Sequence, residues 1–194
     1  MSRALFAGWM PDADGRERLA SLVSALEAAR PAGTPPLKPR RPDQWHATLC
    51  FIAHAPPDYV VATARHALAS VASAIPTHDI AIGRLAYWVG PGVIVALPRQ
   101  SDALQALCDE CSRSLRRAGL VPDHDTSQPH VTLARPGRHL PPQAWLGDVD
   151  CAGPALRVDR FQLLFNPGGR YEVLGDWPLQ GAAWPSPSQH SAPS

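Results

Sequence analysis

One short motif occurs twice in the chain, and its repetition constrains the fold more than any other feature. Residues 46–49 and 130–133 both read His-x-Thr-Leu, and they are well separated along the sequence. Random placement of the same residues would produce on the order of 0.03 such motifs in a chain of this composition. The repetition therefore predicts two equivalent halves, each built around one motif.

The periodicity of apolar residues places the two motifs at equivalent points. In the first half it predicts a strand at 4–10, a helix at 15–30, a strand at 46–53, a helix at 58–75 and a strand at 78–89. In the second half it predicts a strand at 93–97, a helix at 101–118, a strand at 130–134, a short helix at 141–146, and strands at 156–165 and 171–178. Predicted loops at 31–42 and 122–129 precede the motifs. Each motif thus lies in the third element of its half.

The spacing within each motif suits acid–base chemistry on a phosphate. In a strand, residues two apart point to the same face, so each motif presents an imidazole beside a hydroxyl while the residues between and after them face the packing. An unperturbed histidine titrates near pH 6.5, so one neutral ring can take a proton from water while a charged ring protonates a leaving oxygen. Threonine hydroxyls can donate to the non-bridging oxygens. Two facing motifs therefore predict phosphodiester hydrolysis without a metal.

Composition and length limit the binding partners, the cellular location and the domain organisation that we expect. The chain has 194 residues and a formal net charge of +1, which argues against a broad electrostatic grip on nucleic acid. We find no secretory leader and no apolar stretch long enough to span a bilayer, so we expect a cytoplasmic protein without a membrane partner. We also expect a monomer with a single bilobal domain at 1–180 and a disordered tail at 181–194.

Two other clusters have a functional and a plain interpretation. Cys108 and Cys111 could form a redox or metal pair, but both fall on the apolar face of a predicted helix and no second ligand pair exists. Packing is therefore the prediction for these cysteines. The basic run at 38–41, just before the first motif, could touch RNA phosphates or remain a solvated loop.

The sequences around both motifs resemble a known family. Residues 41–51 (RPDQWHATLCF) are similar to the first signature of the LigT-like RNA 2′,3′-cyclic phosphodiesterases, of the two-histidine phosphoesterase superfamily, and residues 129–135 (PHVTLAR) to the second. Trp45 departs from the family pattern, where a smaller aliphatic residue is common, and so does the Pro-rich loop; both bear on substrate preference. The resemblance implies an α+β fold of two pseudo-symmetric antiparallel-sheet-plus-helix lobes around a central cleft.

The same resemblance implies an activity and its main residues. The activity is hydrolysis of an RNA 2′,3′-cyclic phosphate to a 2′-phosphomonoester without metal or cofactor, with RNA 2′–5′ ligation as the reverse type of reaction. His46 and His130 match the catalytic histidines of the family, and Thr48 and Thr132 match its phosphate-binding threonines. The expected partners are RNA ends or nucleotides that carry a 2′,3′-cyclic phosphate.

The resemblance implies two further site residues, and for each the question is which side of its strand it faces. Phe51, five residues after the first histidine, matches an aromatic position that stacks on a base, and Arg135 matches an arginine near the phosphate or nucleotide. In an ideal strand each would face away from its histidine, so these roles require a bend or an end of the strand. A core aromatic at 51 and a solvated arginine at 135 are the competing interpretations.

Several alternatives remain open at this point. We assign His46 as the acid and His130 as the base, although the equivalent motifs leave that order open. The chain could instead act on small cyclic nucleotides or on 2′–5′ oligonucleotides, or it could be a nucleotide- or RNA-binding module without turnover. A histidine metal site ranks last, because no carboxylate is closely spaced to either histidine.

Overall fold

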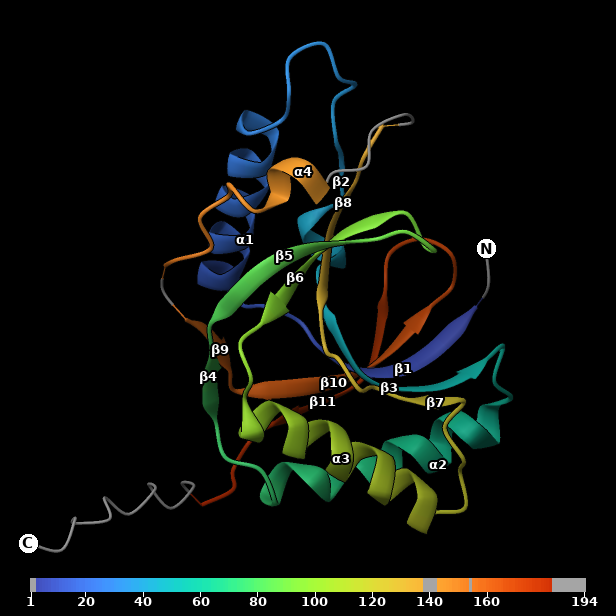
Figure 1. Ribbon diagram of the computed structural model, residues 1–194. Helices are drawn as coiled ribbons and strands as arrows, with labels where there is room; N and C mark the ends of the chain where they lie inside the picture. The colour runs from blue at the N-terminus through green and yellow to red at the C-terminus, as the bar shows by residue number, and fades with distance from the viewer. Residues whose placement is uncertain (1–2, 138–142, 154, 183–194) are drawn as a thin grey trace, which may run out of the picture.

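The computed structural model describes residues 3–137, 143–153 and 155–182 (Figure 1). Its helices are α1 (Ala13–Ala28), α2 (Asp58–Ala69), α3 (Asp102–Arg117) and α4 (Gln143–Leu146), with 3-10 turns at Pro42–Gln44 and Val71–Ser73. Its strands are β1 (Ala4–Trp9), β2 (Lys38–Pro39), β3 (Ala47–His54), β4 (His78–Ile80), β5 (Ile82–Trp88), β6 (Val93–Pro98), β7 (His124–Asp125), β8 (Val131–Arg135), β9 (Leu156–Val158), β10 (Arg160–Asn166) and β11 (Glu172–Pro178).

The strands form two groups that meet in the middle of one sheet. The order is β11-β10-β1-β3-β8-β6-β5, each neighbouring pair is antiparallel, and β4 and β9 form a separate two-stranded sheet. Figure 1 shows α2 and α3 lying along the group that contains β3 and β10, and α1 and α4 beside the group that contains β8 and β5. The α+β fold class with antiparallel sheet and helices is therefore confirmed.

Strands from both ends of the chain build the first group. The first strand, β1, lies between β3 and β10, so Phe6 pairs with Leu164 on one side and with Phe51 on the other. Because β10 and β11 close this group, the sequence halves do not correspond to the two strand groups.

The two motif strands meet at one point and then diverge. Among the described residues, β3 and β8 pair only through Ala47 and Val131, the middle residues of the two His-x-Thr triplets. Beyond that point, β7 pairs with β3, and β2 pairs with β8. Each motif strand thus has as its further neighbour the short strand that precedes the other motif, which is a pseudo-twofold arrangement.

Each motif strand carries a bulge at the leucine of its motif. On β3, Thr48 pairs with Gly8 and Cys50 with Ala7, which leaves Leu49 as the extra residue. On β8 the extra residue is Leu133, between the residues that pair with Val95 and Ile94. A bulge shifts the alternation of the following side chains by one position. Residues five after each histidine therefore return to the histidine's side of the strand.

Several predicted boundaries were wrong. The strand predicted at 78–89 is β4 and β5, because Ala81 leaves the ladder and its carbonyl oxygen accepts from the backbone N–H of Arg99, 2.8 Å away. The strand predicted at 156–165 likewise divides at Asp159 into β9 and β10, which belong to different sheets.

Other predicted elements differ at their ends or lie partly beyond the described residues. The helix predicted at 58–75 ends at Ala69 and continues as a 3-10 turn. The predicted loops at 31–42 and 122–129 contain the two-residue strands β2 and β7. Of the short helix predicted at 141–146, the described part is α4, and of the tail predicted at 181–194 only the first two residues are described.

The cysteines of α3 lie in the core. Cys108 and Cys111 are buried free thiols on the face of α3 that packs against β3, where Ser112 Oγ donates to Cys50 Sγ at 3.4 Å. Burial raises the pKa of Cys108 to about 12 and that of Cys111 well above its usual value. The thiols therefore stay protonated, and they pack as small apolar side chains.

The buried motif leucines should matter for stability. Leu133 is 0 % exposed, so Leu133→Ala leaves a cavity and should lower the free energy of unfolding by about 2–5 kcal/mol in urea titrations. Val121→Ala is the control, because Val121 is 75 % exposed and should change stability by less than about 0.5 kcal/mol. Equal small losses in both variants would contradict the burial of Leu133 in the core.

Candidate active site

The two motif histidines are held in the same way. Nδ1 of His46 lies 2.9 Å from the carbonyl oxygen of Gln44, and Nδ1 of His130 lies 3.0 Å from that of Gln128. A carbonyl oxygen only accepts, so each Nδ1 carries the proton. In the neutral ring, Nε2 is then the unprotonated nitrogen, which can accept a proton from water. Once protonated, the same nitrogen can donate its proton to a leaving oxygen.

The register of the two motif strands brings the four motif side chains together. Because Ala47 opposes Val131 in an antiparallel pair, the positions on either side are opposed too: His46 faces Thr132, and Thr48 faces His130. Opposed side chains on one face have Cβ atoms about 4.5–5.5 Å apart. All four are half-buried, whereas the motif residues between and after them are buried, so the histidines and threonines share the open face.

The two histidines differ in their electrostatic surroundings. Burial lowers the pKa of His46 to about 4, with the nearby charges of His130 and Arg40 acting in the same direction and the Gln44 carbonyl opposing them. Burial also lowers the pKa of His130, while the hydrogen bond to the Gln128 carbonyl acts in the opposite direction. The free site therefore holds His46 as a neutral ring, and the mutual repulsion disfavours two protonated rings.

Aromatic rings enclose His46. The ring centroid of Phe6 lies 4.9 Å from that of His46, and the ring of Tyr171 meets it edge-on at 5.0 Å. Tyr171 follows the β10–β11 turn, which is fastened to the first motif segment: Gln44 Nε2 donates to the Gly169 carbonyl at 2.9 Å. An Arg170–Asp43 ion pair at 3.2 Å adds to this attachment.

Arg40 supplies positive charge on the His46 side. Its backbone N–H donates to the Leu133 carbonyl at 2.7 Å, which ties the segment after β2 to the second motif strand. Its guanidinium lowers the pKa of both His46 and Tyr171, although burial leaves the pKa of Tyr171 raised on balance. In the sequence, this residue was marked only by the basic run at 38–41, for which contact with RNA phosphates and a solvated loop were both possible interpretations.

A cavity opens on the His130 side. It has a volume of about 370 Å³, within the usual range for small-molecule sites. Its lining residues are Thr48, Phe51, Trp88, Thr126, Ser127, Gln128 and His130. Phe51 thus shares a cavity with Thr48 and His130, as the bulge at Leu49 allows. The cavity is bounded by aromatic rings and hydroxyl groups, a suitable combination for a nucleoside.

Arg135 and Trp88 lie on the β8 side of this cavity. Arg135 is exposed, and its Nη1 donates to the carbonyl oxygen of Pro91 at 2.5 Å and of Gly92 at 3.5 Å, in the β5–β6 turn. The Trp88 ring centroid is 4.0 Å from that of His130. No sequence signal marked Trp88, because its contact with the motif is made between segments that are distant along the chain.

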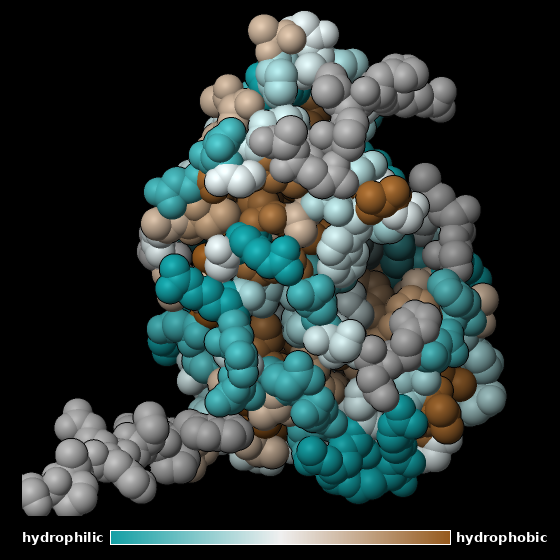
Figure 2. All heavy atoms as spheres, in the orientation of Figure 1, coloured by the Kyte–Doolittle hydropathy of each residue, from teal (hydrophilic) through white to brown (hydrophobic). Residues whose placement is uncertain are grey.

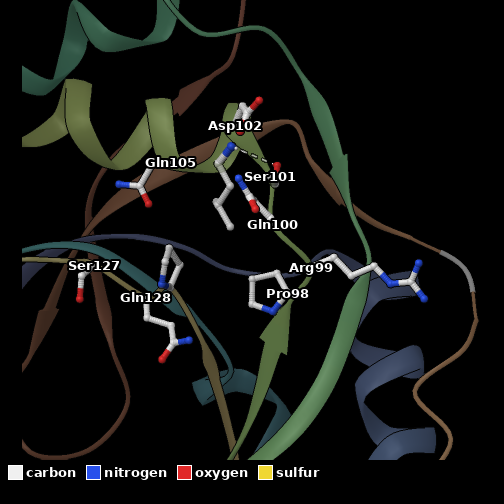
Figure 3. A pocket seen from close by; sticks show the side chains of 10 residues that line it. Pro98, Arg99, Gln100, Ser101, Asp102, Gln105, Ser127 and Gln128 are labelled. Atoms are coloured by element: carbon white, nitrogen blue, oxygen red, sulfur yellow. Dashed lines mark hydrogen bonds between the residues drawn. The ribbon is translucent and has the colours of Figure 1, made fainter.

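A second, slightly larger cavity lies next to the segment before His130. It has a volume of about 420 Å³ and shares Ser127 and Gln128 with the first cavity (Figure 3). Figure 3 shows these two residues on one side and Ser101, Asp102 and Gln105 at the start of α3 on another. No motif histidine or threonine lines this second cavity. Figure 2 shows hydrophilic side chains gathered over α3.

The fold and the paired motifs define a phosphoesterase class, and the family comparison agrees. The model of the 2′-5′ RNA ligase superfamily matches residues 15–169. The chain belongs to this superfamily, the LigT-like group of the two-histidine phosphoesterases. None of the curated protein sequences compared with the chain matches it.

Solved structures share the fold at low sequence identity. TT0787 of Thermus thermophilus is 23% identical over 93% of this chain and 100% of its own, with a TM-score of 0.71. E. coli LigT in apo form is 19% identical over 91% of this chain and 97% of its own, with a TM-score of 0.62. E. coli LigT complexed with 3′-AMP is also 19% identical, over 92% of this chain and 99% of its own, with a TM-score of 0.63.

The described part of the chain holds neither a candidate metal centre nor a candidate membrane-spanning helix. Within 3–137, 143–153 and 155–182, no three His, Cys, Asp or Glu side chains gather so that they could hold a metal ion. No helix in the same part of the chain is long and apolar enough to cross a membrane.

The depressed pKa of His46 predicts a pH-dependent stability. A histidine in the unfolded chain titrates near 6.5, and His46 in the folded chain at about 4, so the unfolded state binds more protons between these values. Stability is therefore highest above pH 6.5 and falls as the pH drops toward 4. In His46→Gln, urea unfolding should show a smaller loss of stability between about pH 7.5 and about pH 5 than in the wild type.

The control for this measurement is His66→Gln, on the exposed side of α2. It should lose stability with falling pH as the wild type does. If His46→Gln also followed the wild type, the enclosure of His46 by Phe6 and Tyr171 would not be what disfavours its protonation.

Proposed function

We propose that the protein hydrolyses the 2′,3′-cyclic phosphodiester at RNA ends or on nucleotides to a 2′-phosphomonoester, without a metal. The observation that carries this proposal is the pairing of Ala47 with Val131, which places both His-x-Thr pairs on one face. Membership of the LigT-like family supports it. The solved complex of E. coli LigT with 3′-AMP also supports a nucleotide as the ligand.

The proposed reaction is an in-line displacement at phosphorus. One neutral histidine takes a proton from a water molecule, whose oxygen forms the new bond to phosphorus. The bond from phosphorus to the 3′ oxygen breaks, and the other histidine, protonated, supplies the proton for that oxygen. The hydroxyls of Thr48 and Thr132 donate to the non-bridging oxygens, where charge grows in the transition state. One histidine gains a proton and the other loses one, so proton exchange with solvent restores the starting protonation states before the next cycle.

The surroundings of the two histidines favour an order for these roles. The leaving 3′ oxygen belongs to the nucleoside, and the cavity that suits a nucleoside adjoins His130 and not His46. Burial also keeps the pKa of His46 low, which suits a base that is neutral before the reaction. We therefore propose His46 as the base and His130 as the acid, the reverse of the order assigned from the sequence.

The same arrangement suits ligation. If the 5′ hydroxyl of a second RNA end replaces water, displacement of the 3′ oxygen forms a 2′–5′ phosphodiester. The description of the superfamily as 2′-5′ RNA ligases supports this use of the site. Small cyclic nucleotides remain alternative substrates, because the cavity of about 370 Å³ accommodates one nucleoside.

Both histidines should be needed for turnover. His46→Ala and His130→Ala should each lower kcat for an RNA with a 2′,3′-cyclic end by about 10²- to 10⁴-fold. The double variant should lose little more than the worse single variant, because both residues serve one step. The wild-type rate should be unchanged in excess EDTA. Near wild-type turnover in either folded single variant would exclude that histidine, and a rate restored only by a divalent ion would exclude the metal-free reaction.

A substrate with sulfur in place of the bridging 3′ oxygen should separate the acid from the base. A thiolate leaves without protonation because its pKa is far below that of an alcohol, so loss of the acid no longer matters. His130→Ala should approach the wild-type rate on this substrate, whereas His46→Ala should stay slow. Recovery of His46→Ala instead would establish the order assigned from the sequence, and recovery of neither would show that both residues act on the attacking water or the phosphoryl oxygens.

A further inference from the structure

The second cavity, next to the start of α3, has no part in the proposed proton transfers. Its volume of about 420 Å³ is close to the volume of the first cavity, about 370 Å³, and both fall in the range of small-molecule sites. None of the four motif side chains lines the second cavity. The second cavity therefore has room for one more nucleoside, beyond the one that the first cavity accommodates.

The segment before His130 joins the two cavities. Ser127 and Gln128 line both of them. Ser127 is three residues from His130, at most about 11 Å along an extended chain. Within the described part of the chain, neither the Ser127 hydroxyl nor the Gln128 side-chain amide makes a hydrogen bond. Both groups can therefore donate to a phosphate that crosses from one cavity to the other.

Glutamine amides provide hydrogen-bonding groups on the α3 side of the second cavity. Gln100 is exposed, and its amide makes no hydrogen bond to the residues that the structure describes. Gln105 donates from Nε2 to Oδ1 of Asp109 at 2.8 Å, which leaves its amide oxygen as an acceptor. Amides pair well with nucleobase edges, because both offer donors and acceptors side by side. In single-stranded RNA these edges are open to a protein.

The charges around the second cavity favour a neutral ligand. Figure 3 shows Arg99 extending away from the other labelled side chains. The stem of Arg99 passes over Gly83 so closely that a Cβ there would lie 2.9 Å from its Cγ. Asp102 is exposed and adds a negative charge to the lining. A phosphate inside the cavity would be repelled by this carboxylate, whereas a nucleoside carries no charge.

A third cavity also adjoins the first but is less suited to a nucleoside. It has a volume of about 300 Å³ and shares only Thr126 with the first cavity. Its lining includes Arg113, whose guanidinium already forms an ion pair with Glu110. The second cavity is larger, shares two residues with the first and has amides without protein partners, so it is the better continuation of the site.

We propose that the second cavity binds the nucleoside that precedes the terminal nucleotide, so that the preferred substrate is the end of an oligonucleotide. This inference rests on the proposed function, which places the terminal nucleotide in the first cavity. The phosphate that links the two nucleotides then lies over Ser127 and Gln128. Neutral hydrogen-bonding groups supply the added affinity, so no broad basic surface is needed, in agreement with the formal net charge of +1.

The first experiment compares three substrates of increasing length. They are adenosine 2′,3′-cyclic phosphate, the same nucleotide with a 5′-phosphate, and the dinucleotide ApA with a 2′,3′-cyclic phosphate. The dinucleotide should have a kcat/KM about tenfold above that of the 5′-phosphorylated mononucleotide, the value of one or two hydrogen bonds. If the 5′-phosphate alone gave the whole gain, the second cavity would hold no nucleoside and the proposal would fail.

Variants of the two glutamines test the same cavity. Gln100→Ala and Gln105→Ala should each lower kcat/KM for the dinucleotide by about two- to tenfold, and the double variant by more. The loss on the 5′-phosphorylated mononucleotide should be much smaller. An unchanged preference in the double variant would overturn the proposal. Equal losses on both substrates would overturn it too, because the glutamines would then support only the catalytic site.

Two control variants complete the comparison. Gln180→Ala removes an exposed glutamine that lines none of the described cavities, and it should keep the full preference for the dinucleotide. Arg113→Gln changes the third cavity and should also keep it. Loss of the preference in Arg113→Gln, with none in Gln100→Ala, would place the preceding nucleotide in the third cavity and overturn the proposal.

Binding measurements separate this proposal from the proposed function. Calorimetry with adenosine 2′-phosphate, with its 5′-phosphorylated form and with ApA 2′-phosphate needs no hydrolysis. The wild type should bind the dinucleotide most tightly, and the glutamine double variant should lose only that advantage. If the wild type hydrolysed none of the cyclic substrates while this pattern held, the proposed function would fail and the second nucleoside site would stand. Turnover of all three cyclic substrates at the same rate, with equal binding of the three products, would give the opposite result.

Discussion

The site depends on the contact between two strands at Ala47 and Val131. An antiparallel pair at the middle residue of each His-x-Thr triplet sets each histidine opposite the threonine of the other motif. The strands then diverge to other partners, β7 and β2, so the four side chains lie where the sheet opens. A register shift of one residue would turn the motif side chains to the other face.

The pseudo-symmetry of the backbone does not extend to the surroundings of the two histidines. His46 is enclosed by Phe6 and Tyr171, with the positive charge of Arg40 nearby, whereas His130 adjoins an open cavity. Equivalent rings in different surroundings have different proton affinities. This asymmetry can therefore assign the roles of base and acid to different histidines, even though the two motifs are alike. The nucleoside and the attacking water would then approach from different sides.

Parts of this structure could be predicted from the sequence, and the reasons are physical. The two-residue period of a strand was enough to place His46 beside Thr48, and the duplication predicted two equivalent motif strands. The bulges at Leu49 and Leu133 could not be predicted, because a bulge is defined by the partner strand. Tyr171 and Trp88 reach the histidines through segments distant in the chain, so no local pattern marked them.

The position of β1 has a consequence for biosynthesis. This strand leaves the ribosome well before β10, yet one of its edges pairs with β10, where Ala4 lies opposite Asn166. At about 5–20 residues per second, the partner strand is synthesised on the order of ten seconds later. During that interval an apolar edge of the nascent sheet lacks its neighbour, and exposed edges of this kind favour pairing between chains. Chaperone capture of β1 during translation would protect the nascent chain until β10 has emerged.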